Sequence, residues 1–586
     1  MCTTVIVGKA VSATGSVLVG HNEDAGGRMV PQQFFCPGGA RPVGAVLTAE
    51  PGRAVLPDVP QVLDTFWCNM MAPAPGSSFD QGMANGAGLV LCSNGGGTSY
   101  EGEKSDEALG LKDGGIGFLF RRTVMERAHC AREAVRIAAA LIDEYGYFGI
   151  ARNYTFADAD EAWVMNVVKG RHYVARRIPD DKVVLISNSL SIRTVDLTDT
   201  DNTAASPDLI EHAVKEGHYR PAREGDFSDF DFARAYQSDD NRRDPNKSVR
   251  MRTGWEALTG TVYEDELDYP EMLTPAKPMS PADIRRILRL SDPQSILTRS
   301  DGRVDAFHVS ARDICRSHTR LSWVAALSPD PMTLTFWNCI GPTETGVYVP
   351  WFPFTGRLPA DAAVMTLAEA RRFHFDADPE ALSFGSAEDR PSRYAAAAVL
   401  SEVVNFDRAY LAGVRPVQAQ LEAGFEARLK TLFARLPEER GARAEALVKA
   451  MNVMQEEADE SRNALLDEIA PDFARVIRRR KTSASGEVLI EIAVESTPDF
   501  NAANIDPKSV CWGLGFTSSK ASALAPAKPL DFEYRETEEG DIEAVFTFRA
   551  AEVEPHMVKG VLHDSYLRGL ARCRRFVTTV PVKLPD

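Results

Sequence analysis

The sequence begins with MCTTVIVGKAVSATGSVLVGHNED, residues 1–24, and so places a cysteine directly before a run of β-branched residues. Two such runs, TTVIVGKAV and GSVLVGHNED, flank the turn-rich SATG segment, and this pattern predicts an N-terminal β-hairpin. Most chain termini are poorly ordered, whereas a terminus that enters a strand is held in place. We therefore expect Cys2 to have a fixed position at the start of a strand.

The thiol of Cys2 has two interpretations. Free cysteine packs well in protein interiors, so Cys2 can be a small hydrophobic residue at a sheet edge. Alternatively, Met1 is removed, and Cys2 then carries a free α-amine with an ordinary pKa of roughly 8. Such an amine can accept the thiol proton, as it does in N-terminal threonine and serine nucleophiles. Position in the sequence does not decide between the two.

Composition limits the class of protein. A chain of 586 residues is long enough for two or more domains, and a net charge of −17 argues against nucleic acid or an anionic membrane as a partner. The 9 cysteines are scattered without a CxxC pair, which is typical of a reducing compartment. The sequence shows neither a signal-peptide pattern nor an apolar run as long as a membrane span. We expect a cytoplasmic protein.

The order of predicted elements indicates an α+β fold. ANGAGLVLCSNGGG predicts a strand, residues 114–147 predict one long helix, and residues 161–189 predict three further strands. Strands, then a helix, then strands favour a layered α+β domain over regular βαβ alternation.

The rest of the chain divides by composition into three expected parts. Residues 2–358 form the core, with an irregular insertion of short helices around residues 201–298. Residues 359–481 are helical without a sustained heptad, which favours a packed helical region over a coiled coil. Residues 482–586 alternate in polarity and predict a small β-rich domain.

Several polar residues at predicted strand ends are candidates for chemistry. His21 can tune the Cys2 thiolate, and Asp24 can hold an α-ammonium group or order the thiol. Asn94 and Asn188 can donate to an oxyanion, and Arg250 can bind a carboxylate through two hydrogen bonds. Each also has a structural interpretation, as a turn residue or as an arginine on a solvated face.

Five segments together carry a resemblance to a known family, and they occur in the family's order: MCTTVIVGKAVSATGSVLVGHNED, NGAGLVLCSN, residues 113–147, residues 161–188 and SHTRLSWVAAL followed by GPTETGVYVPWFP. The chain resembles the N-terminal-nucleophile (Ntn) dipeptidases of the dipeptidase A and secernin type, and more distantly penicillin V acylase and bile salt hydrolase.

This resemblance implies an αββα sandwich with Cys2 as the nucleophile. It places Asp24 where an aspartate orients the nucleophile, Asn94 at the oxyanion hole, Asn188 near a substrate-facing position and Arg250 near a catalytic-site arginine. His21 stands where many relatives have arginine, and Asn166 replaces an expected carboxylate. The resemblance does not include the β-rich tail.

The sequence therefore predicts a cysteine dipeptidase in which Cys2, Asp24 and Asn94 are catalytic and His21, Asn188 and Arg250 bind substrate. The predicted mechanism requires no metal or cofactor, its substrate is a dipeptide, and the protein is expected to be a homo-oligomer. Two alternatives remain: an amidase or acyltransferase acting on a non-peptide amide such as an N-acyl amino acid, and a non-catalytic interaction protein of the secernin sort.

Overall fold

The structure is a computed structural model. It describes residues 2–584 apart from these positions: 26–29, 49–51, 72–78, 118, 264–268, 291–313, 317, 361, 364, 376–391, 407–409, 470–474, 498–499, 515–525, 539, 558–561 and 573. Met1 and the last part of the predicted insertion lie outside the described residues.

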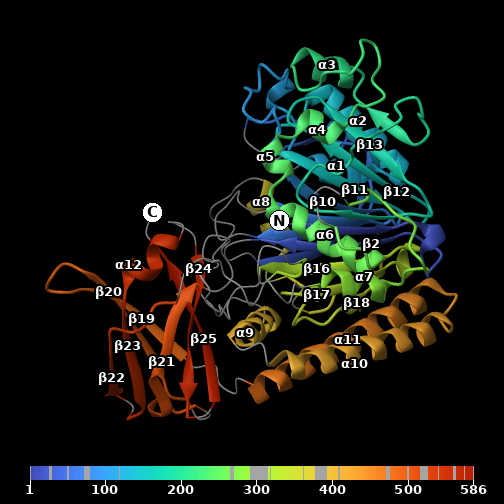
Figure 1. The fold of residues 1–586 in the computed structure, drawn as a ribbon. Coiled ribbons are helices and arrows are strands. Elements are labelled where there is room, and N and C mark those ends of the chain that lie inside the picture. The colour runs from blue at the N-terminus through green and yellow to red at the C-terminus, as the bar shows by residue number, and fades with distance from the viewer. Residues whose placement is uncertain are drawn as a thin grey trace.

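Two antiparallel sheets form the centre of the molecule (Figure 1). The 6-stranded sheet has the order β14 (Val183–Ile186), β1 (Cys2–Val7), β2 (Leu18–Asp24), β16 (Thr319–Ala326), β17 (Thr335–Ile340) and β18 (Val349–Trp351). The 8-stranded sheet has the order β15 (Thr203–Ala205), β13 (Tyr173–Ile178), β12 (Ala162–Val167), β11 (Ala151–Ala157), β10 (Val90–Gly97), β9 (Phe79–Asn85), β8 (Thr65–Met71) and β3 (Val30–Cys36).

The predicted N-terminal hairpin is confirmed. β1 and β2 pair antiparallel with Cys2 opposite Glu23 and Thr4 opposite His21. Every residue of both strands is buried, because one face of this sheet packs on the other sheet and the opposite face is covered by helices. A near-continuous β-branched run suits a strand that is buried on both faces.

Helices cover the outer faces of both sheets. One apolar cluster includes Ile6 from β1 and Cys92 from β10, which lie between the two sheets. A second cluster joins the 8-stranded sheet to α1 (Leu119–Arg127) and α2 (Ala131–Tyr145), and α7 (Pro281–Leu288) packs on the outer face of β2 and β16 (Figure 1).

The prediction of one long helix over residues 114–147 was wrong. The chain forms two helices: α1 ends at Arg127, and Cys130, extended with φ −155°, is the N-cap of α2. The amide of Ala131, at the start of α2, donates to Asp158 Oδ2 at 2.7 Å, which satisfies an otherwise unpaired helix N-terminal group. The three strands expected in residues 161–189 are β12, β13 and β14, as predicted.

The segment after β14 supplies β15 and a series of helices: α3 (Leu209–Lys215), α4 (Phe232–Tyr236), α5 (Asp239–Arg242), α6 (Pro245–Thr259) and α7. α6 lies near β14 and carries Arg250 to the start of β1. α7 begins with a capping box, in which the Ser280 side chain accepts from the Asp283 amide and the Asp283 side chain accepts from the Ser280 amide.

The helical region consists of α8 (Leu367–Phe375), α9 (Ser392–Phe406), α10 (Leu411–Phe433) and α11 (Arg440–Ile469). α10 and α11 pack on the side of the 6-stranded sheet where β18 lies (Figure 1), and Phe425 and Met451 belong to the apolar cluster that includes Ile6. None of the described helices combines the length and the apolar character that crossing a membrane requires.

The C-terminal β region begins at Arg475, earlier than the predicted residue 482. The 4-stranded sheet has the order β19 (Arg475–Thr482), β20 (Val488–Glu495), β23 (Ile542–Arg549) and β22 (Asp531–Glu536). The 3-stranded sheet has the order β21 (Ile505–Leu514), β24 (Leu562–Ala571) and β25 (Arg574–Lys583). β19 escaped the prediction because its run of basic residues hides the strand; Arg478 and Arg480 both pair with Glu554.

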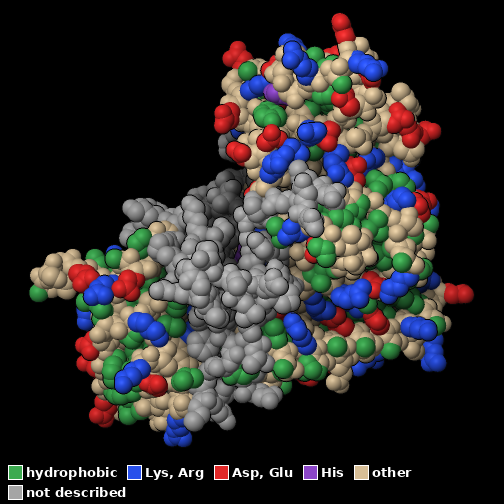
Figure 2. Space-filling model, viewed as in Figure 1, with side chains coloured by type: hydrophobic (Ala, Val, Ile, Leu, Met, Phe, Trp, Pro, Cys, Tyr) green, Lys and Arg blue, Asp and Glu red, His purple; other side chains and the backbone are tan. Residues whose placement is uncertain are grey.

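The C-terminal sheets enclose their own apolar cluster and contact the rest of the chain through α9. A buried ion pair between Arg568 Nη2 and Glu402 Oε2, at 2.5 Å, lies in this contact. On the visible face of the molecule, acidic and basic side chains are interspersed (Figure 2).

Candidate active site

Strand alternation sorts the polar residues of β1 and β2 onto two faces. Cys2 and Thr4, with their cross-strand partners His21 and Glu23, face the 8-stranded sheet, where Thr4 Oγ1 donates to Asn94 Oδ1 at 2.7 Å. The intervening residues face the helices: Asn22 Nδ2 donates to the carbonyl oxygens of residues 288 and 314 at 2.9 and 3.0 Å. The register of the hairpin therefore decides which polar side chains lie beside the thiol.

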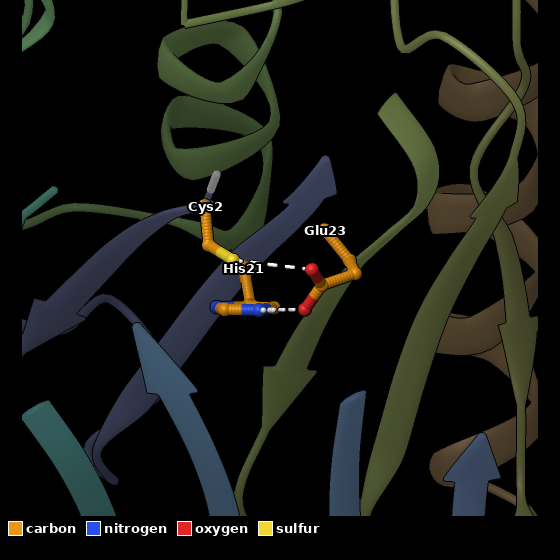
Figure 3. A group of neighbouring side chains, drawn as sticks. All are labelled: Cys2, His21 and Glu23. Carbon is orange, nitrogen blue, oxygen red and sulfur yellow. Dashed lines mark hydrogen bonds and ion pairs between the residues drawn. The ribbon is translucent and has the colours of Figure 1, made fainter. Parts of the chain in front are cut away.

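The Cys2 thiol lies in a buried cluster with a carboxylate and an imidazole (Figure 3). Its Sγ donates to Glu23 Oε1 at 3.1 Å, and Glu23 Oε2 lies 3.4 Å from His21 Nε2. Cys2 is 6% exposed and Glu23 is 3% exposed. The structure thus gives the thiol an acceptor, Glu23, that the sequence analysis did not single out.

Hydrogen bonding determines the protonation of His21. The single proton of Thr4 Oγ1 is donated to Asn94 Oδ1, so Thr4 must accept from His21 Nδ1, which is 2.8 Å away. The other ring nitrogen, Nε2, faces the Glu23 carboxylate. An ionised carboxylate can only accept a hydrogen bond, so Nε2 also carries a proton. Burial by itself lowers the pKa of His21, but Cys92, Cys2 and Glu23 together raise it well above its usual value. His21 is therefore held as an imidazolium.

The backbone of Cys2 is held on its other side by two predicted site residues. The Cys2 nitrogen donates to Asn188 Oδ1 at 2.7 Å. Arg250 donates to the Cys2 carbonyl oxygen and to Asn188 Oδ1, both at 2.7 Å. Burial, followed by repulsion from Arg316, lowers the pKa of Arg250 to about 9. Cys2, Asn188 and Arg250 thus come together.

Asn94 and Asp24 occupy different surroundings. Asn94 accepts from Thr4, and its amide nitrogen makes only a long 3.4 Å contact with the Ile186 carbonyl oxygen. Asp24 accepts from Thr319 Oγ1 at 2.6 Å and lies 3.7 Å from Arg316 Nε. Burial raises the pKa of Asp24. Asp24 lies on the face of β2 opposite Glu23.

Two further asparagines position the segment that carries Asn188. Asn153 Nδ2 donates to the Ser189 carbonyl oxygen at 2.9 Å, and Asn166 Oδ1 accepts from the Ser191 amide at 2.9 Å. Asn166 also donates to Asn153 Oδ1 at 2.7 Å. The amide at position 166, where the resemblance led us to expect a carboxylate, therefore stabilises the loop after β14.

Within the described part of the chain, Cys2, His21 and Glu23 form a group whose potential metal-ligand atoms all lie within 4.8 Å of one another. Sulfur, imidazole nitrogen and carboxylate oxygen are the ligands that zinc prefers. The sequence analysis found no clear metal cluster, because Cys2 and Glu23 become neighbours only when the hairpin forms. Metal binding would require a neutral His21 and a deprotonated Cys2, whereas both ring nitrogens of His21 face Thr4 and Glu23 as donors.

A cavity of about 300 Å³ adjoins this site. Its lining includes Ser187 and Ser189, on either side of Asn188, and Met251, next to Arg250. Arginines 193, 234, 242 and 243 also line it. The cavity thus lies beside the segments that hold the Cys2 backbone and has a basic rim.

Comparison with known proteins finds similarity to a family of peptidases. Residues 113–362 match the model of Peptidase family C69. The chain is 28% identical to dipeptidase A of Lactobacillus helveticus over 232 residues, which are 38% of this chain and 48% of the relative. It is 26% identical to a probable dipeptidase of Salmonella dublin over 297 residues, 49% of this chain and 66% of the relative. The chain is therefore similar to peptidase family C69 over part of its length.

These matches confirm the resemblance drawn from the sequence. The chain spans about half the length of the curated relatives it matches. Among solved structures, it is similar to a variant of conjugated bile acid hydrolase from Clostridium perfringens, with 11% identity and a TM-score of 0.27, covering 57% of this chain and 88% of that one. The family match includes Asn188 and Arg250 and begins after Cys2.

Proposed function

We propose that this chain is a cysteine dipeptidase with Cys2 as its nucleophile. The observation that carries the proposal is the environment of Cys2, whose sulfur and nitrogen are each held by a buried polar partner, Glu23 and Asn188. The proposal is supported by the C69 family and by relatives that are named dipeptidases. A thiol kept only for packing needs neither partner.

The proposed reaction begins with removal of Met1, which frees the α-amine of Cys2. This amine, directly or through water, accepts the thiol proton, and sulfur attacks the scissile carbonyl carbon. The tetrahedral intermediate collapses as the C–N bond breaks, and the leaving amine takes the proton from the α-ammonium. Water then hydrolyses the thioester and releases the N-terminal amino acid of the dipeptide.

The surrounding residues are proposed to act at different points of this cycle. Asn188 and Arg250 hold the Cys2 backbone so that the amine stays beside the sulfur. Asn94 is proposed to supply an oxyanion donor, since its amide nitrogen makes only a long contact at present. Asp24 is proposed to stabilise the α-ammonium, while His21 and Asn188 border the substrate.

We further propose that the two central sheets and their covering helices form the αββα sandwich of Ntn hydrolases. The proposed domains are a core to residue 358, a helical region, and a β-rich unit that starts with β19 at Arg475. A cytoplasmic homo-oligomer remains our expectation for the assembled protein.

Release of free amino acids from a panel of dipeptides, measured by chromatography, tests the proposal. The protein should hydrolyse dipeptides, Cys2→Ala should abolish hydrolysis, and intact mass should show that Met1 is absent. Cys130→Ala is a matched control, because Cys130 lies at the N-terminus of α2, outside the site. A Cys2→Ala variant that still hydrolyses dipeptides, or an active protein that keeps Met1, would contradict the mechanism.

A further inference from the structure

Glu23 differs from most of the buried carboxylates of the chain in its surroundings. A lysine or arginine nitrogen lies within about 4 Å of Asp24, Glu101, Glu126, Glu344, Glu402, Glu422, Glu491 and Glu554, and among the described residues only Glu543, in the C-terminal strand β23, shares with Glu23 the lack of such a neighbour. In the described part of the chain, Glu23 has no such neighbour, and its only ion-pair partner is His21. Its second oxygen is occupied by the thiol of Cys2.

The reaction removes that second partner. Glu23 Oε1 accepts the thiol proton at 3.1 Å in the resting site. When Cys2 becomes a thiolate, the same oxygen loses its donor and faces a negative sulfur at that distance. A buried acceptor without a donor and two like charges in contact are both unfavourable. The reacting site therefore requires a new cationic donor at Glu23 Oε1.

In the resting site, the nitrogen of Cys2 is bonded elsewhere and does not fill this place. The Cys2 nitrogen is bonded to Asn188 Oδ1 at 2.7 Å, and Asn188 is itself bonded to Arg250. These residues belong to β14 and its following loop and to α6, whereas Glu23 belongs to β2. The imidazolium of His21 does not fill it either, because its two nitrogens are directed to Thr4 Oγ1 and to Glu23 Oε2.

The substrate can bring the missing cation. In a dipeptide with a free N-terminus, the α-nitrogen is two bonds, about 2.5 Å, from the scissile carbonyl carbon. An attacking sulfur lies about 3–3.5 Å from that carbon. The α-ammonium group is then within about 6 Å of Cys2 Sγ at most, and Glu23 Oε1 lies 3.1 Å from the same sulfur. A charge-assisted N–H···O bond fits between them.

We propose that Glu23, held by His21, is the binding site for the α-ammonium group of the substrate, and so restricts the enzyme to peptides with a free N-terminus. This inference rests on the proposed function and narrows its substrate class. An N-acylated dipeptide would place a neutral amide against a buried carboxylate, and an N-acyl amino acid would place an apolar acyl chain there. Glu23 is then a specificity residue that also compensates the thiolate when substrate is present.

Alkylation of Cys2 tests the inference without requiring hydrolysis. 2-Bromoethylamine carries an ammonium group two bonds from the carbon that sulfur attacks, while iodoacetamide is neutral. With each reagent the S–C bond forms, halide leaves and the thiol proton passes to buffer. We expect Cys2 to prefer the cationic reagent, relative to free cysteine, by about 10- to 100-fold. Mass spectrometry of the Cys2 peptide measures both rates, with EDTA present to remove bound metal.

Three variants locate the preference. Glu23→Gln, which keeps size and removes charge, should lower it to that of free cysteine, and Glu23→Asp should retain part of it. Glu543→Gln is the matched control, because Glu543 is a buried carboxylate in β23 of the C-terminal sheet, outside the site, and its replacement should leave the preference in place. Circular dichroism verifies that each variant is folded. A preference that survives Glu23→Gln, or that Glu543→Gln removes, overturns the proposal.

Hydrolysis supplies the second readout. We compare kcat/KM for an alanyl dipeptide and for its N-acetyl form in the original protein and in Glu23→Gln. The variant should lose about 10- to 100-fold on the free dipeptide and little on the blocked one, so that the ratio falls. An equal loss on both substrates contradicts a role in ammonium binding. If the original protein hydrolyses neither substrate, the proposed function fails, and the alkylation preference still decides the role of Glu23.

Discussion

Glu23 and Glu101 are both buried carboxylates beside histidines, yet their charges are balanced differently. Glu101 is 0% exposed, and its Oε1 lies 3.8 Å from His212 Nε2 and 3.7 Å from His218 Nδ1. Lys104 Nζ lies 2.9 Å from Glu101 Oε2 and supplies a permanent positive charge. Glu23 has a histidine and a thiol, and the thiol loses its proton in the proposed reaction.

The difference separates a structural carboxylate from a functional one. A buried charge is tolerated when a fixed partner compensates it, and its removal then costs stability. A buried charge whose partner changes during turnover is compensated only in part by the fold, and its removal affects chemistry first. The following predictions test whether the Cys2 cluster and the Glu101 cluster divide in this way.

The largest effect is expected at Asn94, which joins the Cys2 cluster through Thr4. Asn94→Ala should lower kcat for dipeptide hydrolysis by on the order of 10²- to 10³-fold, because an oxyanion donor strengthens only as charge develops. KM and the melting temperature should remain close to normal, and Cys2 should still react with thiol reagents. Steady-state kinetics measures kcat and KM, and thermal unfolding measures the melting temperature.

Asn153 provides the control for Asn94. The two residues are cross-strand partners in β10 and β11. The side chain of Asn153 donates to the Ser189 carbonyl oxygen at 2.9 Å and only weakly, at 3.5 Å, to the backbone carbonyl oxygen of Asn94. Asn153→Ala should lower the free energy of unfolding by about 0.5–3 kcal/mol. If Asn94→Ala melts early and its folded fraction turns over normally, Asn94 is structural.

The fold could be predicted where local patterns were strong. The first hairpin and strands β12–β14 have β-branched runs and clear turns. β3 was missed, because VPQQFFC contains two buried glutamines that do not look like core residues. Gln33 is satisfied by an amide pair with Asn338, at 3.0 and 3.1 Å, across 305 residues. Such a long-range partner leaves no local signal.

The site could be predicted only in part, because some of its contacts depend on partners that are distant in the sequence. The sequence draws attention to GHNED as one polar group, but strand alternation divides it between two faces. Counting the hairpin register from Cys2 would have found Glu23, its direct cross-strand partner. The family resemblance suggested Arg250 with an uncertain register, and its contacts with Cys2 depend on how α6 packs.

A second, smaller effect distinguishes the two carboxylates by stability. Glu101→Gln should lower the free energy of unfolding by about 1–3 kcal/mol, because Lys104 loses a charged hydrogen-bond partner. Glu23→Gln should change stability less and lower turnover of free dipeptides more. Urea unfolding and dipeptide kinetics on the same preparations give both values.

Lys104→Met complements this comparison, since it leaves Glu101 buried without its fixed cation. It should also reduce stability, while the folded protein keeps its kcat. A Glu101→Gln variant with normal stability and impaired turnover would reverse the assignment of the two clusters.

The smallest effect is a pair of opposite pH slopes. The pKa of His21 is raised, so His21 stabilises the fold below its unfolded pKa of about 6.5, and this contribution is lost as pH rises through the folded pKa. Burial lowers the pKa of His218, so its contribution to the stability of the fold is lost as pH falls below about 6.5.

Urea unfolding from acid to mildly alkaline pH measures the free energy of unfolding of the original protein, His21→Asn and His218→Asn. The difference between the original protein and each variant gives the contribution of that histidine. The His21 difference should shrink with rising pH and the His218 difference with falling pH. Slopes of the same sign would mean that His21 is not held as an imidazolium between Thr4 and Glu23, and the contrast between the two clusters would disappear.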